Sequence, residues 1–273
     1  MSVRLILRQD LLALRRTKLV WAVLLFCPLL VFGGFYAVVS NQTGTNQTVL
    51  LGLLGIVFPI LVFVPMLSLV VSAFSIAKER EQGNIRFLLS FPNDRREVVL
   101  GKFCSRSLLT AGGLLVGFVL ATLLSVFLTG TLNIGMFLTF SVLTLLLMTS
   151  YVSIATGISA TVTTQSRAIV ASIGAYLVWN VFWIPAVPNS IPSLLEQHFG
   201  LSNSSLILLR MGSPSNAYLQ SIQYVSPRTE KLVETMSAGS ELGSPLVAVS
   251  MLIVWSVLPL VLGYWQFQKA DIS

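Results

Sequence analysis

Side chains that commonly carry enzymatic chemistry are few and widely separated in this sequence. The only histidine is His198, and the two cysteines, Cys27 and Cys104, lie in or beside apolar runs without the paired spacing of a zinc site or a disulfide framework. The nearest approach to a nucleotide-binding loop is LGKF at 100–103, which lacks the upstream glycine and the Ser or Thr that would hold magnesium. We therefore expect no catalytic residue, no metal site and no cofactor in this chain.

The densest group of charged residues lies at 75–103, between two long apolar runs. It holds six of the seventeen Lys and Arg residues and four of the ten Asp and Glu residues. Gly83 is placed to end a helix, and 84–90 has the pattern of a short amphipathic helix. Asp94 with Glu97 forms a capping-box pattern that predicts the start of the next helix. The segment should therefore fold as a helix, a short helix and a second helix.

Four apolar residues interrupt the charges of this segment: Phe87, Leu88, Leu89 and Phe91. An exposed apolar group rimmed by charge usually marks a contact with a partner. The alternative is a solvated loop held by local ion pairs, each worth about 0–1 kcal/mol. That alternative does not account for the apolar residues, so we expect a contact that is ionic at its edge and apolar at its centre.

The rest of the chain has the composition of a membrane protein. Hydrophobic residues make up 55% of the chain and charged residues 10%, against about 25% charged in a typical soluble domain. Such a composition predicts an all-α polytopic protein with a single transmembrane domain over 1–273.

Six apolar runs are long enough to cross the ~30 Å hydrocarbon core of a bilayer as helices. Pro59 and Pro65 should kink the second span, and Gly112, Gly113 and Gly117 should allow close packing of the third. The predicted spans are about 19–39, 49–74, 108–128, 134–154, 168–187 and 246–265.

Residues 1–18 should form an amphipathic helix on the membrane surface. Val3, Leu7, Leu11 and Leu14 fall on one helical stripe, next to a stripe of arginines that could meet anionic headgroups. The alternative is an ordinary basic flank that only orients the first span.

The distribution of basic residues predicts the orientation. With six spans, fourteen Lys and Arg residues fall on the side of the termini and three on the other side. The positive-inside rule then places both termini and 75–103 in the cytoplasm of a multi-pass cell-membrane protein, and 189–245 outside as a cap. The three N-x-Ser/Thr sequons, at Asn41, Asn46 and Asn203, all fall outside as candidate glycosylation sites.

The predicted spans contain no Asp, Glu, Lys, Arg or His, which argues against an ion-driven carrier. Their most polar residue is Asn180, which shares a helical face with Tyr176, Trp179 and Trp183. This face is either an aromatic anchor at the membrane interface or part of the lining of a pathway.

Two motifs carry a family resemblance. The pattern E-x-x-x-G-x-x-x-x-L-L-S-x-P-x-x-R-x-x-V-x-x-G-K, from Glu79 to Lys102, resembles the first cytoplasmic loop of ABC-2 type transporter permeases. Pro214-Ser215-Asn216-Ala217-Tyr218 is similar to the Pro-x-x-Ala-Tyr element often found in the outer segment of that family. The predicted outer segment is longer than the small re-entrant helices typical of the family.

The resemblance implies a six-span membrane subunit served by a separate ATP-binding subunit, on which ATP and magnesium would be bound. Two permease copies, identical or different, would assemble with two ATP-binding subunits as an exporter. The helix at 84–90 would be the coupling helix, while Glu79 and Glu81 would meet basic residues of that subunit or brace the loop. The residues assigned to the coupling contact are Glu79, Glu81, Gly83, Arg86, Phe87, Leu88, Leu89, Pro92 and Arg95.

By the same resemblance, the second and fifth spans would line a path between two permease copies. The residues assigned to that path are Phe63, Met66, Tyr176, Asn180 and Trp183. Two alternatives stay open. One is a complex of the same architecture that transmits force to an extracellular partner of 189–245 without moving a cargo. The other is a channel or membrane scaffold that needs no ATPase. No nucleic-acid partner is expected, because the basic residues flank apolar runs.

Overall fold

The computed structural model describes residues 3–15, 17–40, 46–83, 94–130, 132–183, 190–200, 202–230, 233–234 and 243–269, and all regular secondary structure within these ranges is helical. The elements are α1 (Val3–Arg15), α2 (Lys18–Val39), α3 (Asn46–Gly55), α4 (Val57–Ala73), α5 (Ala77–Glu81), α7 (Arg95–Thr129), α8 (Ile134–Thr161), α9 (Gln165–Tyr176), η1 (Leu177–Val181), α10 (Ile191–Phe199), α11 (Asn203–Arg210), α12 (Pro214–Ser221), η2 (Ile222–Tyr224), η3 (Pro227–Thr229) and α14 (Pro245–Lys269).

Within the described ranges, five helical stretches have the length and hydropathy of membrane spans: 20–39, 48–81, 95–129, 134–161 and 245–269. They coincide with five of the six predicted spans. The predicted fifth span, 168–187, is occupied by α9, with 12 residues, and by the π-helical η1, with 5 residues. The last part of that prediction, 184–189, lies outside the described residues.

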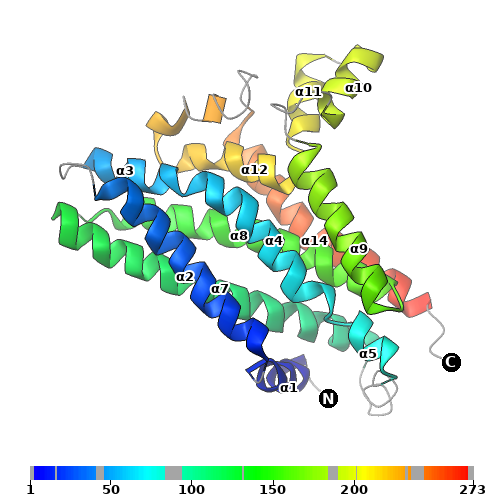
Figure 1. Ribbon diagram of the computed structural model, residues 1–273. Coiled ribbons are helices and arrows are strands. Elements are labelled where there is room, and N and C mark those ends of the chain that lie inside the picture. The colour runs from blue at the N-terminus through cyan, green and yellow to red at the C-terminus, as the bar shows by residue number, and fades with distance from the viewer. Residues whose placement is uncertain are drawn as a thin grey trace.

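The second span is broken at two points into α3, α4 and α5. The first break is at Ile56, so Pro59 falls in the first turn of α4, where its missing N–H costs no helical hydrogen bond. The predicted distortion near Pro59 is therefore confirmed, as a break, whereas Pro65 lies inside α4. The second break, between α4 and α5, detaches α5 as a separate short helix at one end of the bundle (Figure 1). We call this end, with α1, α5 and the first turns of α7, the charged end.

Helix α8 lies at the centre of the bundle, against α4, α7 and α14 (Figure 1). Its crossing with α14 depends on two glycines, Gly157 and Gly263. A Cβ atom added to Gly263 would lie 2.5 Å from the Cα of Gly157, and one added to Gly157 would overlap the carbonyl of Pro259. The two backbones are therefore in direct contact, as is common where membrane helices pack through small residues.

The α2–α7 contact also depends on glycine. A Cβ at Gly113 would approach Cys27 at 3.1 Å, and one at Gly117 would lie 2.9 Å from Val31, so the predicted packing role of both is confirmed. Gly112, predicted for the same role, has no such neighbour within 4 Å.

Part of the predicted outer cap lies inside the bundle. Helices α10 and α11 stand apart at the end opposite the charged end, but α12 is buried against α8 and α14 (Figure 1). The hydroxyl of Tyr218 is 3.0 Å from Oγ1 of Thr144, ten residues into α8 and thus about 15 Å along that helix. The segment 189–245 is therefore not only a cap, because it supplies a helix to the interior.

Candidate functional site

The charged end is organised around α5, a helix of only five residues. Its first turn is fixed by Ser159 of α8, whose Oγ accepts hydrogen bonds at 3.0 Å from the backbone N–H groups of both Ile76 and Ala77. Ser159 is fully buried. A side-chain oxygen that satisfies the free N–H groups of a helix start acts as a cap supplied by another helix.

Three consecutive charged residues of α5 contact three other helices. Nη1 of Arg80 donates to the carbonyl oxygens of Ala160 and Val162 at 3.1 Å each, where α8 ends. Oε2 of Glu81 accepts from the N–H of Gln165 at 3.0 Å, where α9 begins. Both charges suit the helix dipole, since cations are favoured at the C-terminal end of a helix and anions at the N-terminal end.

The third charged residue, Glu79, belongs to a buried group that also includes Asp10, Lys102 and Arg106, which we call the ion cluster. Nζ of Lys102 on α7 pairs with Glu79 and lies 2.6 Å from Oδ1 of Asp10 on α1. Nη2 of Arg106 lies 3.6 Å from Oδ2 of Asp10, which also accepts a hydrogen bond from Ser105. The ion cluster therefore joins α1 and α5 to the same two turns of α7.

The charges of the ion cluster balance, with two carboxylates and two cations. The side chains of Asp10, Lys102 and Arg106 are at most 10% exposed, so each depends on the others for compensation. Burial by itself would raise the pKa of Asp10. The positive charges of Lys102 and Arg106 and the hydrogen bonds from Lys102 and Ser105 outweigh it and hold that pKa below its usual range.

The helix that follows the charged loop is tied to α14. Nη1 of Arg95 donates to the carbonyl oxygens of Phe267 and Gln268 at 2.6 and 2.8 Å, in the last turn of α14. The guanidinium groups of Arg80 and Arg95 lie over the ring of Phe267, at 5.8 and 5.6 Å from its centre. Both ends of the segment 84–93 are thus fixed to the bundle, one through α5 and the other through α7.

The predicted boundaries of the charged loop are confirmed. Gly83 follows α5 with a φ of 71°, which glycine adopts without strain. Asp94 and Glu97 form the capping box, with Oε2 of Glu97 accepting from the N–H of Asp94 at 3.3 Å. The predicted coupling helix at 84–90 lies outside the described residues, as do five residues assigned to the coupling contact: Arg86, Phe87, Leu88, Leu89 and Pro92.

The structure gives internal partners to Glu79, Glu81 and Arg95, which the sequence assigned to a contact with another subunit. These internal contacts are compatible with the second role considered for the glutamates, bracing the loop, and the contact with another subunit stays a prediction. Asp10 was missed altogether. The sequence places the apolar stripe of α1 on Val3, Leu7, Leu11 and Leu14, whereas the residues of α1 that are buried in the protein include Ile6, Asp10 and Leu14. The sequence did contain a signal for its burial, because Ile6 and Leu14 lie four residues before and after Asp10 on the same helical face.

A second polar group, without formal charge, lies nearer the opposite end. Nδ2 of Asn180 donates to the carbonyl oxygen of Leu61 at 2.9 Å, and its Oδ1 accepts from Ser215 of α12. Ser215 is also 2.8 Å from the hydroxyl of Tyr151 on α8. Asn180 therefore links η1, α4, α8 and α12 from a buried position, and its local π-helical turn is a geometry often found at functional sites.

This polar group supports a prediction on stability. Asn180→Leu should lower the free energy of unfolding by about 1–3 kcal/mol, because it leaves Ser215 and the Leu61 carbonyl without their partner in a buried place. Tyr151→Phe, which removes one hydroxyl, should cost about 1 kcal/mol. Thermal unfolding of the purified protein in detergent measures both. Equal effects of the two substitutions would contradict the central place of Asn180.

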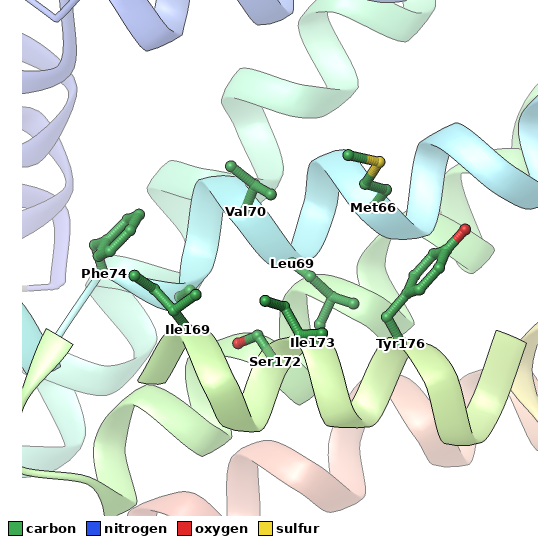
Figure 2. Close-up of a pocket in the computed structure, with 9 residues that line it drawn as sticks. Met66, Leu69, Val70, Phe74, Ile169, Ser172, Ile173 and Tyr176 are labelled. Atoms are coloured by element: carbon green, nitrogen blue, oxygen red, sulfur yellow. The ribbon is translucent and has the colours of Figure 1, made fainter. Parts of the chain in front are cut away.

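An apolar groove of about 410 Å³ lies between α4 and α9 (Figure 2). Of the residues assigned to the pathway, Met66 and Tyr176 line it. Phe63, on α4, is exposed and packs edge-on against Phe26. Asn180 is buried, and Trp183 donates from its indole to the carbonyl oxygen of Leu209 at 3.1 Å, so neither lines this groove.

The sequons add nothing to the site. Asn41 lies outside the described residues, and the side chains of Asn46 and Asn203 are not described either.

Comparison with known proteins identifies a family and a relative. The family described as ABC-2 family transporter protein matches residues 4–272, almost the whole chain. A curated protein of Stutzerimonas stutzeri, "Probable ABC transporter permease protein NosY", is 26% identical over 211 residues, which cover 75% of each of the two chains. The charged end, with its short anchored helix, lies within the residues that the family matches.

Proposed function

This chain belongs to the ABC-2 family of transporter proteins, and from that premise we propose that it is the permease subunit of an exporter driven by ATP through the segment 75–103. Hydrolysis would occur on a separate ATP-binding subunit that holds ATP and magnesium. Two copies of that subunit would assemble with two permeases, the second being either a copy of this chain or a different one. The proposal assigns no catalytic role to this chain.

We further propose that the chain crosses the cell membrane six times, with both termini and the charged end in the cytoplasm. The fifth of these spans would be α9 and η1 together with the residues that follow them. The division of basic residues, fourteen against three, supports this orientation.

The observation that carries the coupling proposal is the set of contacts made by α5. Glu79, Arg80 and Glu81 contact α7, α8 and α9 respectively. On the other side of the loop, Arg95 contacts the end of α14. A force applied to 84–93 would therefore reach several spans at once, instead of bending one loop. In this proposal the ATP-binding subunit receives 84–93, and nucleotide-driven movement of that subunit shifts these spans together.

A pair of substitutions in the loop tests the proposal. Phe87→Asp combined with Leu88→Asp should abolish association with the ATP-binding subunit, because it places charge in an apolar contact. Phe199→Asp is a matched control, since Phe199 is 69% exposed at the opposite end. Both variants should insert and melt like the wild type. The measurement is co-purification of a protein with a P-loop, together with its ATP hydrolysis.

Two results would count against the proposal. If the loop variant retains a fully active ATP-binding subunit, 84–93 is not the coupling contact. If the wild type in its native membrane has no ATP-binding subunit and conducts or assembles without ATP, the channel or scaffold alternative is favoured.

The force-transmitting alternative is supported by the position of α10 and α11, which project from the bundle (Figure 1). They carry exposed apolar residues such as Phe199 and Leu208. In this alternative they dock an extracellular protein. Removing 191–210 would distinguish the exporter from the force-transmitting complex. If the shortened protein loses partner binding but still transports cargo, docking is an additional role of an exporter. If the complex transports no cargo at all, force transmission alone is favoured.

A further inference from the structure

A second hollow, of about 480 Å³, opens beside the ion cluster. Its walls include Asp10, Glu79, Lys102 and Arg106, and also Lys78, which is exposed and has no ion pair with any described residue. Three cations and two carboxylates therefore line this polar cavity. The excess positive charge, and the availability of the Lys78 ammonium, favour an anionic ligand group.

The polar cavity adjoins the apolar groove between α4 and α9. Phe74 lines both. On α9, Gln165 lines the cavity, and Ile169, one turn further along, lines the groove. Figure 2 shows Phe74 and Ile169 at one end of the groove, and Met66 and Tyr176 at the other. The two hollows thus form one composite site, polar at the charged end and apolar beyond it.

The length of the composite site matches one leaflet of a bilayer. Gln165 and Tyr176 are eleven residues apart on α9, which corresponds to about 16 Å along the helix axis. Half of the ~30 Å hydrocarbon core is about 15 Å. A chain that enters at the polar cavity and follows α9 would therefore reach about the middle of the membrane. The hydroxyl of Tyr176 donates a hydrogen bond to the carbonyl oxygen of Val62 at 3.3 Å. Because that hydroxyl is already paired, the far end of the groove is apolar.

We propose that this composite site binds one glycerophospholipid with an anionic headgroup. Its phosphate lies beside Lys78 at the mouth of the polar cavity, and one acyl chain lies between α4 and α9. The balanced ion cluster keeps the cavity polar, while Lys78, which forms no ion pair with a described residue, supplies the excess positive charge. The proposal uses the membrane placement given above, but it does not require ATP-driven export.

Photo-crosslinking in vesicles tests the proposal. The full chain is reconstituted in phosphatidylcholine vesicles that contain a small fraction of phosphatidylglycerol with a photoactivatable group on one acyl chain. Mass spectrometry should then locate the crosslinks on α4 and α9, around Met66, Val70 and Ile173. A photoactivatable diacylglycerol, which has no phosphate, should label these positions several-fold less.

Two matched pairs of variants separate the headgroup from the acyl chain. Lys78→Glu should reduce phosphatidylglycerol labelling several-fold, whereas Lys18→Glu, at an exposed lysine outside the cavity, should not. Ile173→Trp should fill the groove and abolish labelling there. Val170→Trp, on the same helix at a site 70% exposed and outside the groove, should leave labelling intact. Unchanged melting temperatures verify that all four variants fold.

The proposal is overturned if labelling spreads evenly over the exposed faces of α7 and α14, or if Ile173→Trp does not change it. It is also overturned if α9 is crosslinked mainly to a second copy of the chain, which would make the groove an interface between copies. The experiment measures lipid labelling in the absence of ATP. Its outcome therefore does not depend on the coupling proposal, and failure of that proposal would leave the labelling unchanged.

Discussion

Replacing Asp10 with leucine is expected to lower the free energy of unfolding by about 3–5 kcal/mol, the range for breaking a buried ion pair by removing one partner. The substitution leaves three charges in the ion cluster, Glu79, Lys102 and Arg106, with a net charge of +1 in a buried place. It should also weaken the contact of α1 with α7, because Asp10 is the carboxylate of α1 in this contact.

The charge balance provides a strict control. In the double variant Asp10→Leu with Lys102→Met, Glu79 and Arg106 remain and the cluster is neutral again. Much of the lost stability should therefore return, as found when buried ion pairs are exchanged for apolar residues. Arg8→Leu, at an exposed position of the same helix, should change stability by less than about 0.5 kcal/mol. Unfolding of the wild type, the single variants Asp10→Leu and Lys102→Met and the double variant in detergent gives the double-mutant cycle. A double variant less stable than Asp10→Leu would contradict the charge-balance argument.

Acidification should act on the same group with a definite sign. The pKa of Asp10 lies below its usual range in the folded protein, since its cationic neighbours and hydrogen bonds outweigh the effect of burial. A carboxylate with a lowered folded-state pKa contributes stability that is fully present above its unfolded pKa and is lost as the pH falls through the folded value. The stability difference between the wild type and Asp10→Leu should therefore be constant near neutral pH and decrease in acid.

The parts of the fold that follow from local sequence could be predicted. Span positions depend on the length of apolar runs, and five of the six predicted spans coincide with helices that could cross a membrane. The boundaries at Gly83 and Asp94 depend on single residues and their neighbours within one turn, so they were also predictable. The family could be recognised because its motif lies within 24 consecutive residues, from Glu79 to Lys102.

The partners of the charged residues could not be predicted, because they depend on tertiary contacts. Asp10 and Lys102 are 92 positions apart, and Arg80 and Ala160 are 80 positions apart. Local sequence shows only that Glu79 and Glu81 lie next to a cluster of charges, which fits an outward contact and an internal one equally well. Internal pairing prevailed because α5 lies against the ends of three helices that offer a buried lysine, free carbonyls and a free N–H group.

The burial of α12 was missed for a related reason. Its sequence, PSNAYLQS, is polar and resembles a surface segment. Most of its polar side chains nevertheless find a partner on another element, for example Tyr218 with Thr144 and Asn216 with the carbonyl of Trp183. A polar helix can enter a membrane bundle when its hydrogen bonds are satisfied there, and periodicity alone gives no sign of this.

The crossing of α8 and α14 supports the second large prediction. Gly157→Ala and Gly263→Ala should each destabilise the protein by an amount at or above the upper end of the ~1–3 kcal/mol range for overpacking. The added Cβ would meet backbone atoms of the opposite helix, which cannot rotate away as a side chain can. The amount of monodisperse protein after purification and its melting temperature measure the effect.

Two other helical glycines are matched controls. Gly112 on α7 and Gly174 on α9 have no neighbour within 4 Å of an added Cβ. Replacing either with alanine should be neutral, or should stabilise the protein by up to about 0.5–1 kcal/mol through the higher helix propensity of alanine. If Gly157→Ala and Gly263→Ala behave like these controls, the two backbones are not in contact.

The consequence of this crossing extends to the charged end. Gly157 lies two residues before Ser159, the residue that caps α5. Gly263 lies about one turn before Phe267, whose carbonyl oxygen accepts from Arg95 and whose ring lies under the guanidinium group of Arg80. Separating α8 from α14 should therefore separate the two anchors of the segment 84–93. We expect that a Gly263→Ala protein which still folds will lose ATPase coupling out of proportion to its loss of stability, whereas Asn180→Leu, which also destabilises the protein, will not.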